Sequence, residues 1–404
     1  YFTEESFDDF YVGKGSSYPD IHGAVGILFE QAGTKGHLRE TPGMLLSFPF
    51  AIRNQFTVSL STLEAGLRMK NQLLESQKRF YRDALAEAEK HPVKAYIFGE
   101  PSDRSRLNEF VSILLQHKIK VYRPARDIEK NGITYKSSNS FVVPLKQGEY
   151  RFIRSLFEPV TNFSDSIFYD VSTWVLPMSF NLNYAPLMQS KEIEGLAGPE
   201  VTEAPKQSGQ LVSPEKPYAY LFEWTDYNAP KALYRLQEKG LKTRVSGEGF
   251  TCIAGNGRIT FAAGTIVIPC TGQPVEREEL HDLMKKTSEE CGISVYGVQT
   301  GLTESGVDLG SNRIQVLSKP SVAMVAGDGT SSSVAGEIWH LLDSRFGIPV
   351  TLIPVLRFGS SDLNRYNSII IAGSPEIGAA GIEKIKSWTR PGRNIIAVEG
   401  GNRW

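Results

Sequence analysis

The chain has 404 residues, and its 44 lysines and arginines nearly balance its 45 aspartates and glutamates, which leaves a formal net charge of −1. This length exceeds what one hydrophobic core usually supports, so we expect two or three domains. The balanced charge, without a basic stripe, argues against nucleic acid as a partner. No apolar run approaches the ~20 residues of a membrane-spanning helix, so we expect no transmembrane segment.

The first informative segment spans residues 10–36. Glu30 stands directly behind the apolar run Gly26–Phe29, where a carboxylate is costly unless it has a partner or a task. The run predicts a strand that leaves a glycine-bounded turn and ends at Glu30, and residues 31–35 predict the loop that follows. Because catalytic groups of α/β folds lie at such strand ends, Glu30 is the candidate catalytic residue.

This segment resembles the last third of the zinc carboxypeptidase family, the carboxypeptidase A-like metallopeptidases, and in particular its larger bacterial members. Residues 53–65, RNQFTVSLSTLEA, continue the resemblance into the helical segment that follows. The positions of the first segment that carry it are Phe10, Tyr11, Gly13, Gly15, Ser16, Tyr18, Pro19, Gly23, Gly26, Leu28, Phe29, Glu30, Gln31 and Ala32.

The resemblance implies a reaction and its residues. Glu30 would be the general base that takes a proton from zinc-bound water and returns it to the leaving amine. Tyr11 is the position that matches the family's substrate-contacting tyrosine, and Tyr18 is the second candidate for substrate binding. Zinc lowers the pKa of its water towards about 7, so a carboxylate can accept the proton near neutral pH. A peptide substrate and a periplasmic or secreted location are also implied by the family.

In that family the zinc ligands and the arginines that hold the substrate's carboxylate precede the tyrosine and the glutamate. We therefore expect the zinc ligands to lie outside this chain, and the chain alone to be inactive. Two explanations stay open: a portion of a larger exopeptidase, which the abrupt start at Tyr1 favours, or a natural protein that kept the scaffold and lost the metal. The alternative function is a non-catalytic, multi-domain protein that binds peptide or glycan on a degenerate peptidase scaffold.

The first half of the chain divides by composition into a peptidase-like part and an α/β domain. Residues 1–92 predict the C-terminal part of the carboxypeptidase-like domain, closed by a long helix from about Ala51 to Lys90 with one apolar stripe. Residues 93–200 predict an α/β domain whose strand-helix-strand start indicates a parallel sheet. Within it, Asp165, Asp170 and Trp174 invite a binding-site interpretation, but core and cap roles are more common for such residues. Residues 201–217 read as a linker.

The second half predicts two further α/β segments. Residues 218–318 contain a hairpin around Gly255-Asn256-Gly257, and with the region before them they predict doubly wound α/β. Cys252 and Cys270 lie on neighbouring strand-like runs and could pair, although buried free thiols, with Cys291 as the third, are favoured.

Residues 319–404 are similar to class I glutamine amidotransferase-like domains, which the same bacterial carboxypeptidases carry at their carboxyl end, and we expect this domain to be incomplete. Working members of that class place a cysteine nucleophile on the turn after a central strand, but here the turn at 399–402 has none, beginning with Glu399. Without a thiolate there is no covalent glutaminase chemistry, so we expect a catalytically silent domain. The glycines and serines at 327–333 favour a tight strand-to-helix turn over an anion site.

Overall fold

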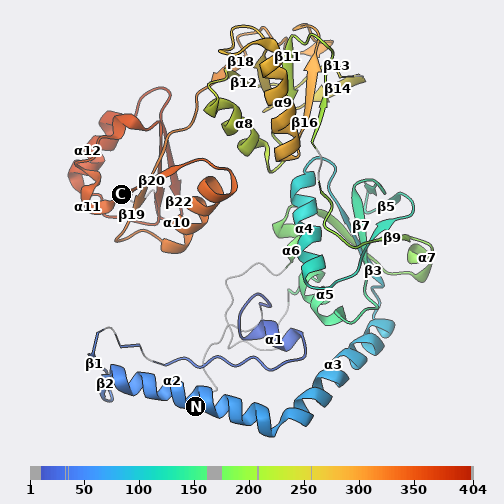
Figure 1. The fold of residues 1–404 in the computed structure, drawn as a ribbon, viewed down its shortest axis with the longest axis vertical. Coiled ribbons are helices and arrows are strands. Elements are labelled where there is room, and N and C mark those ends of the chain that lie inside the picture. Colours follow the sequence, from blue (N-terminus) through green and yellow to red (C-terminus); the bar gives the residue numbers. More distant parts are fainter. Residues whose placement is uncertain are drawn as a thin grey trace. The chain divides into compact units, whose positions relative to one another are not determined.

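The computed structural model describes residues 11–31, 33–34, 36–161, 175–206, 209–255 and 257–401. The chain forms two compact units: Tyr1–Pro101 with Arg106–Pro205, and Ser102–Ser105 with Lys206–Trp404. Both units are mixed α/β structures with several sheets, as Figure 1 shows. Phe10, Ala32, Asp165, Asp170 and Trp174 lie outside the described residues.

Unit 1 begins with elements that belong to no large sheet. A short helix is followed by an extended stretch, a small antiparallel hairpin and two long helices. Ser47 caps the first long helix by accepting a hydrogen bond from the Phe50 N–H, 3.4 Å between Oγ and N. These elements are α1 (Ser17–Ile21), β1 (Leu38–Glu40), β2 (Leu45–Ser47), α2 (Phe48–Arg68) and α3 (Lys70–Lys90).

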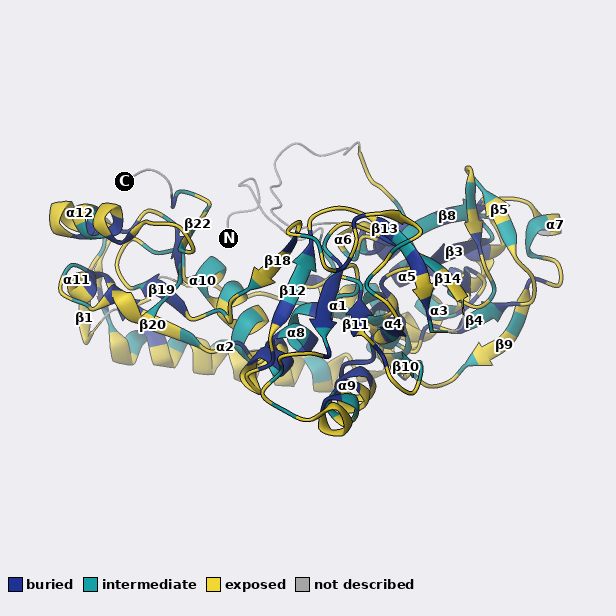
Figure 2. Cartoon of the chain, turned by 90° about the horizontal axis from the view of Figure 1, so that it is seen from above, coloured by how far each residue is buried: buried dark blue, intermediate teal, exposed yellow. Residues whose placement is uncertain are grey.

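The single long helix predicted over residues 51–90 is divided into α2 and α3. Met69 leaves the helical conformation, with φ −96° and ψ 8°, while its N–H still bonds to the Ala65 carbonyl at 2.8 Å. The chain therefore changes direction at one residue, and Figure 1 shows the two helices at an angle. The predicted apolar stripe is largely exposed, as the yellow surface of α2 in Figure 2 indicates.

The main sheet of unit 1 has five strands in the order β8-β3-β7-β4-β9, and all neighbours are antiparallel. The parallel sheet predicted here is wrong, because β7 inserts between β3 and β4 and pairs with both. Those two strands run parallel to each other without being adjacent. The strands are β3 (Ala95–Gly99), β4 (Val121–Pro124), β7 (Ser140–Pro144), β8 (Asn183–Leu187) and β9 (Ala197–Val201).

Alternate residues of β3 point to two different cores. Tyr96 and Phe98 pack with α3, α4 and α5 on one face, whereas Ala95 and Ile97 pack on the other face beneath a small hairpin and α7. The long helices thus cover one face only, so this sheet is not doubly wound. The covering elements are α4 (Arg104–Gln116), β5 (Ile128–Lys130), β6 (Ile133–Tyr135), α5 (Tyr150–Phe157), α6 (Leu176–Ser179) and α7 (Ser190–Ile193).

The first sheet of unit 2 has six strands in the order β10-β16-β11-β15-β12-β18. Only the β10–β16 pair is parallel. Helices α8 (Ala229–Glu238) and α9 (Arg277–Cys291) pack on one face. The predicted double winding is therefore not formed here either. The strands are β10 (Gln210–Val212), β11 (Ala219–Phe222), β12 (Thr243–Ser246), β15 (Ile266–Pro269), β16 (Ser294–Val298) and β18 (Ile314–Leu317).

The other face of this sheet packs against a three-stranded sheet. Its first two strands form the predicted hairpin, with Ala254 paired to Gly257 across the turn, while Asn256 lies outside the described residues. The three cysteines are buried and free, so the pairing of Cys252 with Cys270 does not occur. The strands are β13 (Phe250–Ala254), β14 (Gly257–Phe261) and β17 (Ser305–Gly306).

The last sheet has four parallel strands in the order β20-β19-β21-β22. Helices lie on both faces: α11 and α12 pack on one core and the partly buried residues of α10 and η1 on the other. The elements are β19 (Val322–Ala326), α10 (Ser332–Trp339), the π-helix η1 (His340–Arg345), β20 (Val350–Pro354), α11 (Val355–Phe358), the 3₁₀ turn η2 (Leu363–Arg365), β21 (Ser368–Ala372), α12 (Gly378–Trp388) and β22 (Asn394–Val398).

Candidate functional site

Glu30 lies on an extended segment that runs beside α2 and forms no strand. Its two neighbours are tied to the helix: the Phe29 carbonyl accepts a hydrogen bond from Gln55 Nε2 at 3.2 Å, and Gln31 Nε2 donates to the Ala51 carbonyl at 2.9 Å. The predicted strand is thus wrong, because the main chain of this segment has a helix rather than a sheet edge beside it. The Glu30 carboxylate is exposed and makes no hydrogen bond or ion pair within the described part of the chain.

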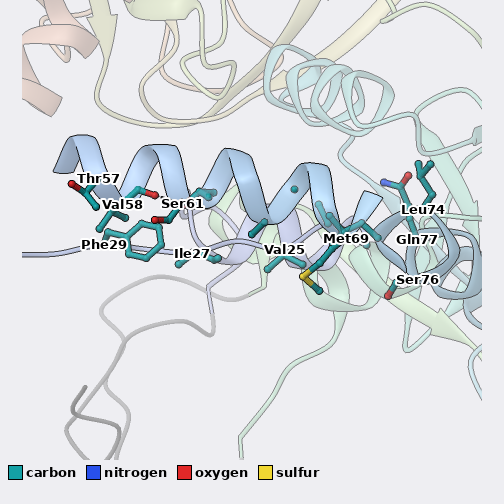
Figure 3. A pocket seen from close by; sticks show the side chains of 16 residues that line it. Val25, Ile27, Phe29, Thr57, Val58, Ser61, Met69, Leu74, Ser76 and Gln77 are labelled. Carbon is teal, nitrogen blue, oxygen red and sulfur yellow. Dashed lines mark hydrogen bonds between the residues drawn. The ribbon is translucent and has the colours of Figure 1, made fainter. Parts of the chain in front are cut away.

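An apolar groove of about 690 Å³ runs between this segment and the two long helices. Figure 3 shows Val25, Ile27 and Phe29 facing Val58 and Ser61 of α2. The lining holds no titratable side chain and does not include Glu30. It consists of Gly23, Ala24, Val25, Ile27, Phe29, Thr57, Val58, Ser61, Thr62, Ala65, Gly66, Met69, Leu73, Leu74, Ser76 and Gln77. The groove can therefore accommodate apolar groups but supplies no acid–base chemistry of its own.

The two candidate tyrosines lie near each other at α1. Tyr18 is part of α1, and the Tyr11 carbonyl accepts a hydrogen bond from the Ser17 hydroxyl. Gly13 lies against the Tyr11 ring, since a Cβ at this position would come within 2.5 Å of Tyr11 Cε1. A glycine is thus required at position 13 for this placement of Tyr11.

The structure does not bring Glu30 together with these tyrosines. Gly23, with φ +70°, lies against the Phe80 ring on α3, whereas Phe29 is held by Gln55 in the first half of α2. Between these two contacts the segment follows the helices away from α1, as Figure 1 shows. Among the described residues, Glu30 and the two tyrosines, Tyr11 and Tyr18, therefore lie at two separate sites.

Tyr18 instead joins a cluster of aromatic and titratable side chains. Its ring centroid lies 4.6 Å from that of His22, 5.6 Å from His117 and 6.1 Å from Phe152. His22 Nδ1 lies 3.0 Å from Glu149 Oε2, an ion-pair distance. The cluster fastens α1 to α4 and α5, and the sequence offered no signal for it because its members are far apart along the chain.

Two pKa values in this cluster are displaced. Burial, aided by the neighbouring His22, lowers the pKa of His117 below its usual range. Burial together with the charges of Glu149 and Tyr18 raises the pKa of Tyr81, whose hydroxyl donates to the His22 carbonyl at 3.2 Å. The cluster therefore favours a neutral His117 and a protonated Tyr81.

Metal-ligating side chains do not converge anywhere in the described ranges, where no group of three His, Cys, Asp or Glu residues could hold an ion. The resembling family takes two of its zinc ligands from a His-x-x-Glu pair. We expected this chain to lack such a pair, and that expectation is wrong, because the spacing occurs at His37 and Glu40. It follows Glu30, unlike the family's order. Glu40 ends the strand β1 and His37 stands just before it, and the described residues place no third ligand beside the two.

The turns of the last sheet are as tight as predicted. Gly327 and Thr330 close the turn after β19, with the Thr330 N–H 3.0 Å from the Gly327 carbonyl, and α10 begins two residues later. Glu399 follows β22 directly and has φ +55°, a left-handed conformation that is uncommon for a residue other than glycine. Asn402, the last residue of the predicted turn, lies outside the described residues.

Comparison with known proteins does not identify a relative. No protein-family model, curated protein or solved structure matches this chain. Among the described residues, no helix combines the length and the apolar character that a membrane span needs.

Proposed function

We propose that this chain is part of a zinc-dependent metallocarboxypeptidase that hydrolyses C-terminal residues of peptides, with Glu30 as general base. The observation that carries the proposal is the run of family-like residues at positions 10–32, which ends at Glu30-Gln31-Ala32. The Glu30 carboxylate is exposed and unpaired within the described part of the chain. On one side of it the Phe29 carbonyl is bonded to Gln55, and on the other the Gln31 side chain is bonded to the Ala51 carbonyl. A carboxylate held in this way is free to accept a proton from attacking water and to return it to a leaving amine.

The proposal places the zinc ligands elsewhere in the parent protein. The described residues supply no group of three ligands, so no step through a metal is derived for this chain. Tyr11 and Tyr18 stay the candidates for substrate binding. To act together with Glu30 they would have to approach it, which requires a different course of residues 11–30 in the active protein. A periplasmic or secreted location belongs to the same proposal.

We further propose that residues 319–404 form a catalytically silent amidotransferase-like domain. Support comes from Glu399, which occupies the turn after a parallel strand in the strained conformation typical of a nucleophile elbow. A carboxylate there cannot perform the thiolate chemistry of a glutaminase.

The alternative is a non-catalytic protein that binds peptide or glycan on a degenerate peptidase scaffold. The apolar groove beside residues 23–29 supports this alternative, because its lining carries no titratable side chain and suits binding rather than acid–base chemistry. The two functions differ in one property, since only the enzyme requires a proton acceptor at position 30.

The test is peptide hydrolysis by the full-length gene product supplied with zinc, assayed on peptides with a free carboxyl end. We expect Glu30→Gln to lower kcat by a factor of about 10² to 10⁴, the usual contribution of a general base. Glu40→Gln, another exposed glutamate in the same region, should keep full activity. The isolated chain of residues 1–404 should show neither turnover nor stoichiometric zinc. Full activity of Glu30→Gln, or a full-length protein without zinc-dependent turnover, would refute the enzyme proposal.

A further inference from the structure

A second pocket, of about 490 Å³, lies within unit 2 and has a different character from the apolar groove. It is built on the sheet face opposite to α8 and α9. Arg244 of β12 is the register partner of Val267 on one side and of Val316 on the other, so these three side chains point to the same face. The complete lining is Tyr218, Ala219, Lys242, Thr243, Arg244, Val267, Pro269, Thr271, Gly272, Leu309, Gly310 and Val316.

The charge of this lining is entirely positive. Lys242 and Arg244 contribute two cations, and no carboxylate lines the pocket. Within the described residues, neither the Lys242 ammonium nor the Arg244 guanidinium makes a hydrogen bond or an ion pair. Arg244 is half-buried in this position. A partly desolvated guanidinium without a counterion is unfavourable, so the site favours an anion that is not part of the chain.

The other arginines of the same sheet region show that a free guanidinium is exceptional there. Each of them has a partner: Arg235 pairs with Glu290 at 2.8 Å, Arg258 with Glu304 at 2.6 Å, Arg313 with Glu248 at 2.7 Å, and Arg277 donates to the Pro217 carbonyl at 3.3 Å. Among residues 209–318, as far as they are described, Arg244 alone among the arginines faces a pocket with its donors unused.

The main chain around the cations is fixed by the Gln273 side chain. Its Oε1 accepts from the Lys242 N–H at 2.8 Å, and its Nε2 donates to the Lys242 carbonyl at 3.0 Å and to the Pro269 carbonyl at 2.7 Å. This clamp joins the start of β12 to the turn after β15. Lys242 Nζ lies near that turn, since a Cβ on Gly272 would be 3.6 Å from it. The main chain that carries Lys242 and Arg244 is therefore fixed before a ligand binds.

Tyr218 provides a fixed wall and a hydroxyl. Its N–H donates to the Val298 carbonyl at 2.6 Å, and its carbonyl accepts from the Cys270 N–H at 3.0 Å. The ring lies against Gly301, where a Cβ would come within 2.8 Å of Tyr218 Cζ. The phenol group makes no hydrogen bond within the described residues, so it is available to a ligand.

We propose that this pocket binds a small organic oxyanion, with a carboxylate or phosphate group on Arg244 and Lys242 and an apolar body on the floor formed by Ala219, Val267 and Val316. A guanidinium presents two parallel N–H donors that match either oxyanion, and the ammonium adds a second charge. The volume is in the range of pockets for small molecules. The site is independent of the proposed peptidase function.

The test is calorimetric titration of the chain of residues 1–404 with phenyl phosphate, benzoate and the neutral analogue benzamide. We expect one-to-one binding of phenyl phosphate, benzoate or both, and none of benzamide. Binding of only one anion identifies phosphate or carboxylate as the preferred group. Arg244→Gln should weaken binding at least about tenfold, and Arg244→Lys less, because the lysine keeps the charge without the paired donors.

Two further variants separate the site from general effects. Lys242 lies on the surface, so Lys242→Gln should weaken binding several-fold without affecting the fold. A circular dichroism melting curve checks that the fold is kept. Arg258→Gln removes a cation that is already paired with Glu304, and it should bind as the parent chain does. The proposal is overturned if neither anion binds up to roughly 10 mM, or if Arg244→Gln and Lys242→Gln bind the anion as tightly as the parent chain.

Discussion

His117 directly follows α4 and has two polar neighbours, and nothing in its local sequence distinguishes it from a surface histidine. In the folded chain its ring stacks on Phe152, with centroids 4.9 Å apart and planes at 21°. Its Nδ1 lies 3.0 Å from the Ile113 carbonyl. The other groups that face it are Tyr18 and His22, and His22 is itself paired with Glu149. Burial and His22 both disfavour a second proton on His117 and lower its pKa.

A pH dependence of stability follows from this lowered pKa. The pKa of His117 in the folded chain lies below the ordinary histidine value of 6.5, so the unfolded chain binds more protons as pH falls through that value. The free energy of unfolding of unit 1 should therefore decrease from pH 7.5 to pH 5.5, and His117→Gln should make the decrease smaller. Urea unfolding followed by circular dichroism at several pH values measures this. His340→Gln, at an exposed histidine of unit 2, should leave the slope as it is; an unchanged slope in His117→Gln would contradict the argument.

The thiols show what single residues allow one to predict. Cysteine is among the most frequently buried residue types, so three cysteines in apolar runs predicted buried free thiols, and this is confirmed. Burial raises the pKa of Cys252 and of Cys270 to about 11.

The surroundings of Glu30 could not be predicted from the residue type in this way. Whether a carboxylate ends a strand or lies beside a helix depends on which element packs there, and four apolar residues do not specify it.

At the scale of elements, the sequence of α2 predicts a helix with one apolar stripe. It does not predict which part of the protein covers that stripe. The spacing of Ile52, Phe56, Leu60, Leu63 and Leu67 predicts one apolar face. In the described structure Leu63 is 71 % exposed and Leu67 is 76 % exposed. Residues 23–29 of the extended segment before β1 line a groove with other residues of α2, Val58 and Ala65 among them. The spacing of apolar residues identifies one face of a helix. Which element packs on that face is decided by the tertiary structure.

The exposure of this stripe can be measured through a pair of leucines. Leu63→Ala should cost no more than about 0.5 kcal/mol in the isolated chain, the usual range for a surface position. Leu114→Ala, in α4 of the same unit, removes a fully buried side chain and should cost about 2–5 kcal/mol. Urea unfolding of both variants provides the comparison. A cost for Leu63→Ala equal to that of Leu114→Ala would mean that the stripe is packed.

At the scale of the molecule, the sequence predicted the α/β class but not the order of strands. Alternating strand and helix signals predicted the class. The turn from Gly255 to Gly257 predicted a hairpin, and this could be read from the sequence because the two paired strands are adjacent in the chain. The first two sheets departed from the expected parallel arrangement since β7 enters between β3 and β4, and β15 enters between β11 and β12. Such insertions depend on contacts between distant segments, which local periodicity does not report.

The division into two compact units predicts separate unfolding steps. Elements within a unit share hydrophobic cores and should unfold together, whereas units with separate cores need not. Phe98 in unit 1 and Phe222 in unit 2 are both fully buried, so each Phe→Ala change should cost about 3–5 kcal/mol in its own unit. Differential scanning calorimetry of the chain should show more than one transition. Phe98→Ala should lower the temperature of one transition and Phe222→Ala that of another, each leaving the other transition in place. If the chain melts in one transition that both substitutions shift equally, the two units form a single cooperative body and the independence of their cores is refuted.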